Sequence, residues 1–266
     1  MPRGLDHIVH AVRDLDAAAA LYESLGFTVG ARNKHSWGTH NRIIQFDGVF
    51  IELLTLAEPG KLGDDGFSKL FGAYTGDYLK RGEGLALLIL ESHDARADEK
   101  DFRAAGIAAS DGLRFDREGK RPDGAPVKVA FSLAFAEDKS APAIHFATCQ
   151  QHYPENFWNP AFQNHANGVT GIAGVVVVAD VPARHRDFLV SFSGASAARD
   201  KDDGFIIELP RGVIDVMTPS GFTGLFGVAP PDTTRGPRLA AIRFSGARAA
   251  GKQAACGALL LFESAR

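Results

Sequence analysis

The chain has 266 residues, of which 45% are apolar and 23% charged, and its formal net charge is −3. This near-neutral balance argues against a general nucleic-acid-binding protein, which needs a basic surface to neutralise phosphates. The two cysteines, Cys149 and Cys256, are too few for a disulfide framework, and no signal-peptide pattern opens the chain. No apolar run is long enough to span a membrane. We therefore expect a cytoplasmic protein that binds neither nucleic acid nor membrane.

Residues 1–57 predict the order strand, helix, strand, strand, strand. Residues 5–12 are apolar and β-branched, which favours a strand, and Asp14 fits the N-cap of a helix over residues 17–25. Gly26 is a typical residue to end that helix. The remaining strands are expected at residues 27–29, 41–46 and 49–56, with a tight turn at 47–48.

The same order of elements recurs along the chain, which indicates a repeat architecture. A second copy is expected over residues 84–148 and a third over 170–217, and a shortened fourth copy begins at residue 238. A glycine-rich insertion at residues 58–82 has apolar residues at helical spacing. We expect a short helix there, which either covers a pocket or packs as a surface excursion.

This organisation predicts two domains. The first, residues 1–155, contains the paired first and second copies and a metal-binding cavity. The second, residues 168–266, contains the third copy and the truncated fourth, and we expect a structural role for it.

Several stretches of the sequence carry a family resemblance. They are Asp6-His7-Ile8-Val9, Leu21-Tyr22, Leu25-Gly26-Phe27, Ile51-Glu52-Leu53, Thr39-His40-Asn41-Arg42 and the connector from Phe157-Trp158 to Asn167-Gly168. The chain resembles the vicinal oxygen chelate superfamily, which includes glyoxalase I, extradiol dioxygenases and bleomycin-binding proteins, and in particular its glyoxalase-like branch. The resemblance implies an α+β fold in which tandem βαβββ modules form half-barrel mixed sheets around a metal cavity.

The resemblance also implies metal ligands on the first and fourth strands of paired modules. In the first module these positions are His7 and Glu52. In the second module they are Leu85, which cannot bind a metal, and His145, which has small neighbours on its face of the strand. Two imidazoles and one carboxylate suit Fe(II), Mn(II), Zn(II) or Ni(II). Each of the three could instead be a hydrogen-bonded core or rim residue.

Other residues are candidates for roles beside the metal. Glu52 and His40 are the candidate catalytic groups, since histidine titrates near neutral pH and a carboxylate can accept a proton. The third module has Ala173 and Asp215 at the ligand positions, so we expect no metal there. The candidate substrate-binding residues are Asn41, Arg42, Trp37 and Trp158.

The leading hypothesis is a glyoxalase-like metalloenzyme that binds a small oxygen-rich or carbonyl substrate at a divalent metal. The reaction would be of lyase, isomerase or dioxygenase type. The alternative is a metal-free protein of the same fold that binds or sequesters a small molecule, such as a bleomycin-resistance protein. A third and weaker hypothesis is an interaction module that uses the aromatic connector at residues 153–162. A homodimer is possible under each hypothesis.

Overall fold

The computed structural model describes residues 1–120 and 126–264. Module 1, the first of the repeated units (residues 1–57), has its helix and strands in the predicted order, although its second strand lies elsewhere than expected. Residues 27–29 form no strand, because Phe27 turns into the core against Phe46 and Phe244 instead of pairing with a neighbouring strand. The elements of module 1 are β1 (Leu5–Ala11), α1 (Leu15–Ser24), β2 (Asn33–Lys34), β3 (Thr39–Phe46) and β4 (Val49–Leu56).

The local signals explain where the elements of module 1 begin and end. The Asp14 carboxylate accepts hydrogen bonds from the first turn of α1, as an N-cap should. Beyond the helix, Gly26 has φ +84°, a left-handed conformation that favours glycine. Gly48 has φ +68° in the turn between β3 and β4.

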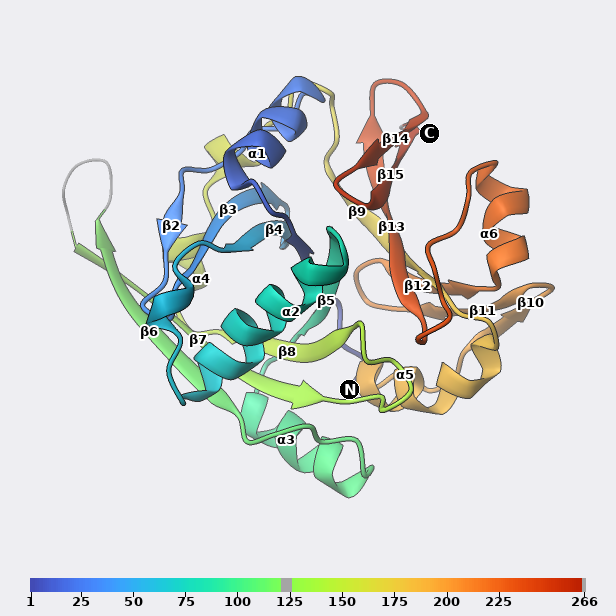
Figure 1. The fold of residues 1–266 in the computed structure, drawn as a ribbon, viewed down its shortest axis with the longest axis horizontal. Coiled ribbons are helices and arrows are strands. Elements are labelled where there is room, and N and C mark those ends of the chain that lie inside the picture. The colour runs from blue at the N-terminus through green and yellow to red at the C-terminus, as the bar shows by residue number, and fades with distance from the viewer. Residues whose placement is uncertain (121–125, 265–266) are drawn as a thin grey trace.

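Module 2 repeats this order, and Asp94 caps α3 as Asp14 caps α1. Strand β4 pairs with β1 in parallel, β1 pairs with β5 antiparallel, and β5 pairs with β8 in parallel. Modules 1 and 2 therefore share one open, curved sheet, whose concave face lies under α2 in Figure 1. The elements of module 2 are β5 (Gly84–Glu91), α3 (Ala95–Ala104), β6 (Leu113–Lys120), β7 (Pro126–Ala136) and β8 (His145–Gln151).

The insertion between modules 1 and 2 is helical, as its spacing predicted. It contains η1 (Pro59–Lys61), the π-helix η2 (Ser68–Ala73) and α2 (Tyr74–Arg81). Phe71 and Tyr78 pack into an apolar cluster on the concave face of the sheet. The insertion therefore covers this face. The connector after β8 forms α4 (Pro154–Phe157) and η3 (Pro160–Phe162).

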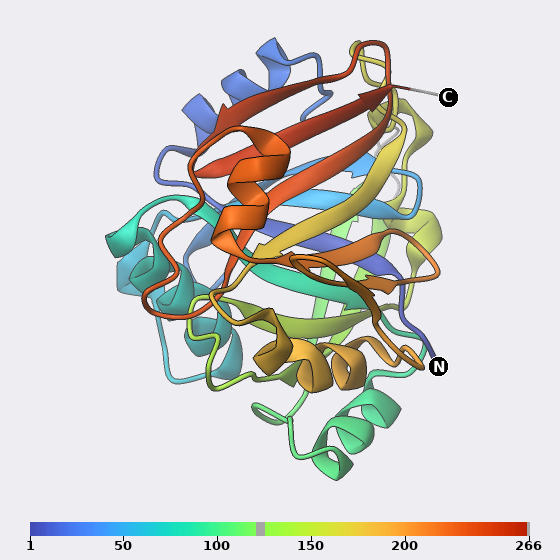
Figure 2. The same ribbon diagram turned by 90° about the vertical axis from the view of Figure 1, so that its right-hand side faces the viewer.

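Modules 3 and 4 form a second curved part of the sheet, built around the antiparallel pair β9–β13. The fourth module has no helix between its first two strands. In Figure 2, α6 lies across the face of this part of the sheet. The elements are β9 (Gly171–Val178), η4 (Pro182–His185), α5 (Arg186–Ser193), β10 (Arg199–Lys201), β11 (Gly204–Glu208), β12 (Val213–Met217), α6 (Pro219–Phe226), β13 (Arg238–Ala247), β14 (Gly251–Ala255) and β15 (Ala258–Ser264).

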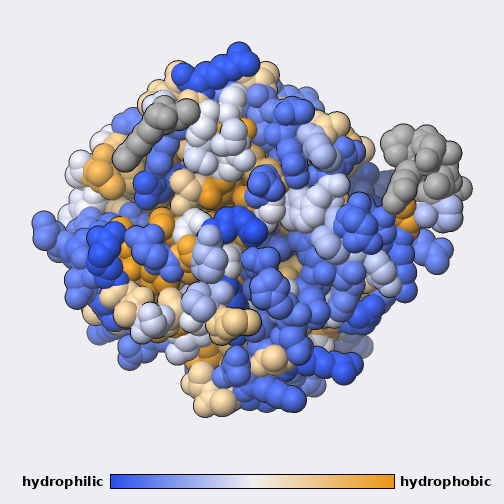
Figure 3. Space-filling view, turned by 180° about the vertical axis from the view of Figure 1, so that it is seen from behind, coloured by the Kyte–Doolittle hydropathy of each residue, from blue (hydrophilic) through white to orange (hydrophobic). Residues whose placement is uncertain are grey.

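The two halves share a core. One continuous apolar cluster includes side chains of β1, α1, α3, β9, α5 and β13. Strand β13 also pairs with β5 at Leu239 and Leu85, which joins the two parts of the sheet. Hydrophilic residues predominate on the outer face seen in Figure 3, and apolar residues show mainly towards its centre and left. No helix in the described ranges is long and apolar enough to cross a membrane.

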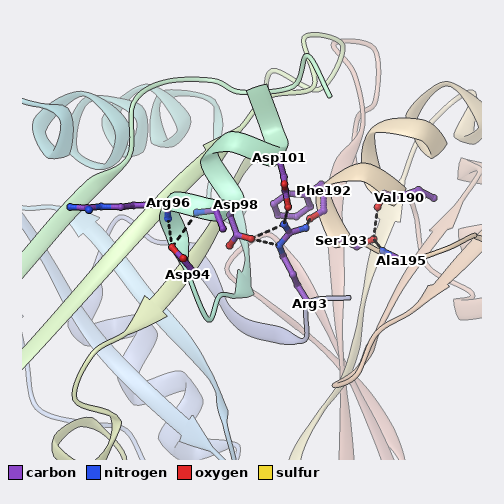
Figure 4. A network of polar contacts seen from close by, with 10 residues as sticks. Arg3, Asp94, Arg96, Asp98, Asp101, Val190, Phe192, Ser193 and Ala195 are labelled. Atoms are coloured by element: carbon purple, nitrogen blue, oxygen red, sulfur yellow. Dashed lines mark hydrogen bonds and ion pairs between the residues drawn. The ribbon is translucent and has the colours of Figure 1, made fainter. Parts of the chain in front are cut away.

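A buried arginine ties three segments of the two halves together (Figure 4). Arg3, just before β1, donates through Nε and Nη2 to Asp98 Oδ1 of α3, at 2.9 and 2.6 Å. Its Nη1 donates to the Phe192 carbonyl of α5 at 2.9 Å. The ion pair is largely withdrawn from solvent, since Arg3 is 7% and Asp98 9% exposed.

Candidate metal centre

The concave face of modules 1 and 2 encloses a cavity of about 100 Å³. Its walls are mainly aromatic, and η2, β6 and β7 supply the side opposite β1 and β4. The aromatic lining residues are Trp37, Phe50, Phe67, Phe71, Phe115, Phe131 and Phe157. Among the residues that the structure describes, few polar groups face the cavity, and they are His7, His35, Asn41, Glu52 and Cys149.

His7 enters the cavity from β1 with a fixed orientation. Its Nδ1 lies 2.5 Å from Asp6 Oδ1, and its ring stacks on Phe50 with the centroids 4.2 Å apart. Gln151 Nε2 donates to the other oxygen of Asp6 at 2.9 Å. Because the carboxylate accepts the proton at Nδ1, the lone pair of Nε2 is left for the cavity. This arrangement is the usual support of a metal-binding histidine.

A β-bulge explains why Asp6 and His7 can interact. Successive side chains of a strand point to opposite faces. The pairing of β1 with β5 shifts register between Leu5 and His7, however. A bulge of this kind re-aims side chains and is common beside functional sites.

Glu52 enters the same cavity from β4 and is 8% exposed. Asn41 Nδ2 donates to Glu52 Oε1 at 2.5 Å, and Asn33 Nδ2 donates to Asn41 Oδ1 at 3.0 Å. Arg117 of β6 extends this chain, since its Nη2 donates to Asn33 Oδ1 at 3.2 Å. Among the described residues Glu52 Oε2 has no hydrogen-bond partner. One oxygen is therefore held, and the other is free for a ligand.

The structure does not bring His145 to the cavity beside His7 and Glu52. Its ring stacks on Tyr74 of α2, and it forms a hydrogen bond with the backbone of Leu70. Burial of the imidazole lowers the pKa of His145 to about 4.

The strand register shows which residues of module 2 are equivalent to the ligand positions of module 1. The N-caps Asp14 and Asp94 are equivalent, so Leu87 corresponds to His7 and Ile89 corresponds to Val9. Val9 pairs with Glu52, and Ile89 pairs with Ala147. The repeat positions of module 2 are therefore Leu87 and Ala147, two residues beyond the predicted Leu85 and His145.

The other predicted site residues fall into two groups. Asn41 and Trp37 line the cavity, whereas His40, Arg42 and Trp158 do not. His40 and Arg42 alternate with Asn41 along β3 and contact Glu58 and Asp16 respectively. Trp158 packs edge-on against Phe50, with the centroids 5.9 Å apart.

The sequence prediction missed two polar groups of the cavity, Cys149 and His35, and the supporting residue Asp6. Single donor atoms of Asp6, His7 and Cys149 all lie within 4.8 Å of one another. Burial, with smaller contributions from nearby carboxylates, raises the pKa of the Cys149 thiol well above its usual value. His35 Nδ1 lies 2.8 Å from Thr39 Oγ1, and burial lowers the pKa of His35.

The third module has a different arrangement at the equivalent positions. Asp215 pairs with Val176 as Glu52 pairs with Val9, so Gly174, rather than the predicted Ala173, occupies the place of His7. Asp215 is 5% exposed and lies 2.5 Å from Lys201 Nζ. An ammonium group therefore neutralises this carboxylate.

The fold and the sequence were compared with those of known proteins. The structure is similar to that of a hypothetical protein from Staphylococcus aureus, with a TM-score of 0.74 and 14% identity over 98% of this chain and 99% of that one. It is also similar to the Mn(II)-bound glyoxalase from Novosphingobium aromaticivorans, with a TM-score of 0.50 and 12% identity over 99% and 83%. A catechol 2,3-dioxygenase gives a TM-score of 0.50 and 11% identity over 99% and 94%.

At these identities the likeness establishes the fold, which confirms the predicted α+β class. No curated protein matches the sequence. The sequence model that describes the glyoxalase-like domain matches residues 5–192, which is most of the chain. The chain therefore belongs to the glyoxalase-like domain family, within the superfamily that its sequence resembles.

Proposed function

We propose that this protein is a glyoxalase-like metalloenzyme, with its metal centre at the His7 and Glu52 end of the cavity. The observation that carries the proposal is the pair of oriented donors. Asp6 holds the His7 imidazole, Asn41 holds one oxygen of Glu52, and both side chains line the same cavity. Support of this kind from neighbouring residues is typical of metal ligands.

The donor set fits a divalent cation. An imidazole nitrogen with a carboxylate oxygen suits Fe(II), Mn(II), Zn(II) or Ni(II). A cation bound there would supply Lewis acidity to a substrate that presents a carbonyl or two neighbouring oxygens. The relatives named above include a Mn(II)-bound glyoxalase and a catechol dioxygenase, which supports a metal-dependent lyase, isomerase or dioxygenase.

The remaining lining residues suit a small substrate with an apolar or ring-shaped part. Aromatic walls surround the polar groups of the cavity, and a ring of a substrate would pack against them with favourable edge and face contacts. Glu52 is a candidate proton acceptor as well as a ligand. His35, rather than the predicted His40, is the second imidazole that faces the cavity.

Metal analysis of protein purified without a chelator or a histidine tag tests this proposal. We expect about one divalent metal per chain in the wild type and loss of stoichiometric metal in His7→Ala and Glu52→Gln. His40→Gln and His145→Gln are matched controls, because their imidazoles lie outside the cavity, and both should keep the metal. Full metal content in His7→Ala would reject the proposed centre.

A second function, metal-free binding of a small aromatic molecule, is favoured by the apolar residues at the module 2 positions. Leu87 and Ala147 occupy the ligand positions of module 2, and neither can bind a metal. Aromatic rings make up most of the cavity walls. A protein free of metal, whose melting temperature rises with aromatic ligands but not with divalent metals, would support this function over the first.

A further inference from the structure

We propose that Cys149 is the third protein ligand of this metal centre and the contribution of module 2 to it. The inference rests on the proposed function and goes beyond it, because it assigns a sulfur donor and thereby a class of metal. His7 and Glu52 both belong to module 1. These two side chains alone would give the cation two protein ligands, fewer than the three of typical catalytic zinc sites.

Cys149 lies where such a donor is needed. It follows Ala147 by two residues on β8, so both side chains face the concave side of the sheet. It is 3% exposed, and it lines the cavity together with His7 and Glu52. A donor atom of Cys149 lies within 4.8 Å of donor atoms of both Asp6 and His7, and Glu52, which lies outside that cluster, lines the same cavity.

Asp6 is the less suitable third ligand, although it belongs to the same cluster. Its Oδ1 already contacts His7 Nδ1, and its Oδ2 accepts a hydrogen bond from Gln151. Both carboxylate oxygens are therefore occupied in holding His7 in place. The Cys149 sulfur has no hydrogen-bond partner within residues 1–120 and 126–264. It is consequently the donor that can turn to a cation without breaking the support of His7.

The ligation step is a simple exchange. A divalent cation forms a bond with the sulfur, the S–H bond breaks, and the proton leaves to solvent, so metal binding releases one proton from Cys149. A donor set of one nitrogen, one oxygen and one thiolate favours Zn(II) and Co(II) over the harder Mg(II) and Mn(II). The thiolate therefore narrows the range of metals that the nitrogen and oxygen donors alone would accept.

Cobalt substitution tests the assignment directly, because a thiolate bound to Co(II) gives an intense charge-transfer absorption in the near ultraviolet. Metal-free protein is titrated with Co(II), and both binding and absorption are recorded for the wild type, Cys149→Ser and Cys256→Ser. The other cysteine, Cys256, lies in the turn between β14 and β15, outside the cavity. We expect the thiolate absorption in the wild type and in Cys256→Ser, and its loss in Cys149→Ser.

The outcomes separate this inference from the proposed function. Stoichiometric Co(II) binding without the thiolate absorption would overturn the role of Cys149 and leave the metal centre intact. Absence of Co(II) binding in the wild type would overturn both. Should Cys149→Ser fail to fold, Cys256→Ser still decides the question, because Cys149 is then the only thiol in the chain.

Discussion

Two side chains that line the cavity, His7 and Glu52, are each held in place by a neighbour that forms a hydrogen bond with one of their polar atoms. Asp6 occupies one nitrogen of His7, and Asn41 occupies one oxygen of Glu52. A carboxylate that is free to rotate would lose conformational entropy on binding a metal. The Asn41 amide removes part of that cost in advance.

Replacement of Asn41 by leucine should therefore weaken metal binding without removing any ligand. We expect a loss of affinity on the order of 10- to 100-fold, the usual effect of removing a residue that supports a metal ligand. Titration of the metal-free protein with Zn(II) or Co(II) measures this loss. Ile43→Val, which changes an apolar lining residue, is the control and should bind metal as the wild type does. Unchanged affinity in Asn41→Leu would show that Glu52 needs no support.

Some residues of the site can be predicted from the sequence, and others cannot. His7, Glu52 and Asn41 follow from strand alternation and from the family resemblance. Asp6 could not be predicted to support His7, because the bulge that brings the two side chains together depends on the pairing of β1 with β5. Cys149 could not be predicted from the repeat, because it lies two residues beyond Ala147, the repeat position of module 2, and four beyond the predicted His145.

Among the elements, the helical insertion between modules 1 and 2 covers a partly buried histidine, His145. His145 of β8 contacts Tyr74 of α2 and the backbone of Leu70 in η2. The sequence predicted this insertion from its apolar spacing. It did not predict α6, where two glycines within Pro219–Phe226 weaken the helix signal and tertiary packing of Phe222 stabilises the helix instead.

Mild acid should destabilise this part of the protein. Burial lowers the pKa of His145 from 6.5 to about 4, so between these values the unfolded chain binds a proton that the folded chain excludes. This group therefore has no effect well above pH 6.5 and opposes folding increasingly as the pH falls towards 4. From pH 7 to pH 5 we expect it to lower the free energy of unfolding by about 2 kcal/mol.

Urea unfolding at the two pH values measures the effect, with His145→Gln as the comparison. The variant should lose less stability on acidification than the wild type does. Burial also lowers the pKa of His10 and of His165, so a smaller dependence on pH should persist in the variant. An identical pH dependence in the two proteins would contradict the assignment to His145.

At the scale of the whole molecule, the two halves are joined by a shared core and by the Arg3 ion pair. The sequence predicted repeated modules, and the strand pairing places modules 1 and 2 on one curved sheet. It did not indicate the pairing of β13 with β5 or the contact of Arg3 with both α3 and α5. Such contacts join residues far apart in the chain, and no local pattern encodes them.

Replacing Arg3 by methionine should strongly destabilise the protein. The change leaves the buried Asp98 carboxylate without its cation, and breaking a buried pair in this way typically costs about 3–5 kcal/mol. Arg103→Met, at an exposed ion pair with Glu99, should change stability by less than about 1 kcal/mol. Urea unfolding of both variants provides the comparison. Equal stability of the two would mean that Arg3 does not tie the halves together.

The ion pair of Lys201 with Asp215 makes the two halves differ in where the partner of their buried carboxylate comes from. In the third module the cation that neutralises the Asp215 carboxylate is a side chain of the protein itself, so it is present as soon as the chain has folded. In the first module the cation that we propose must be acquired from the cell. A chelator or a shortage of metal would thus leave the Glu52 carboxylate without its cation, whereas the Asp215 carboxylate would keep its partner.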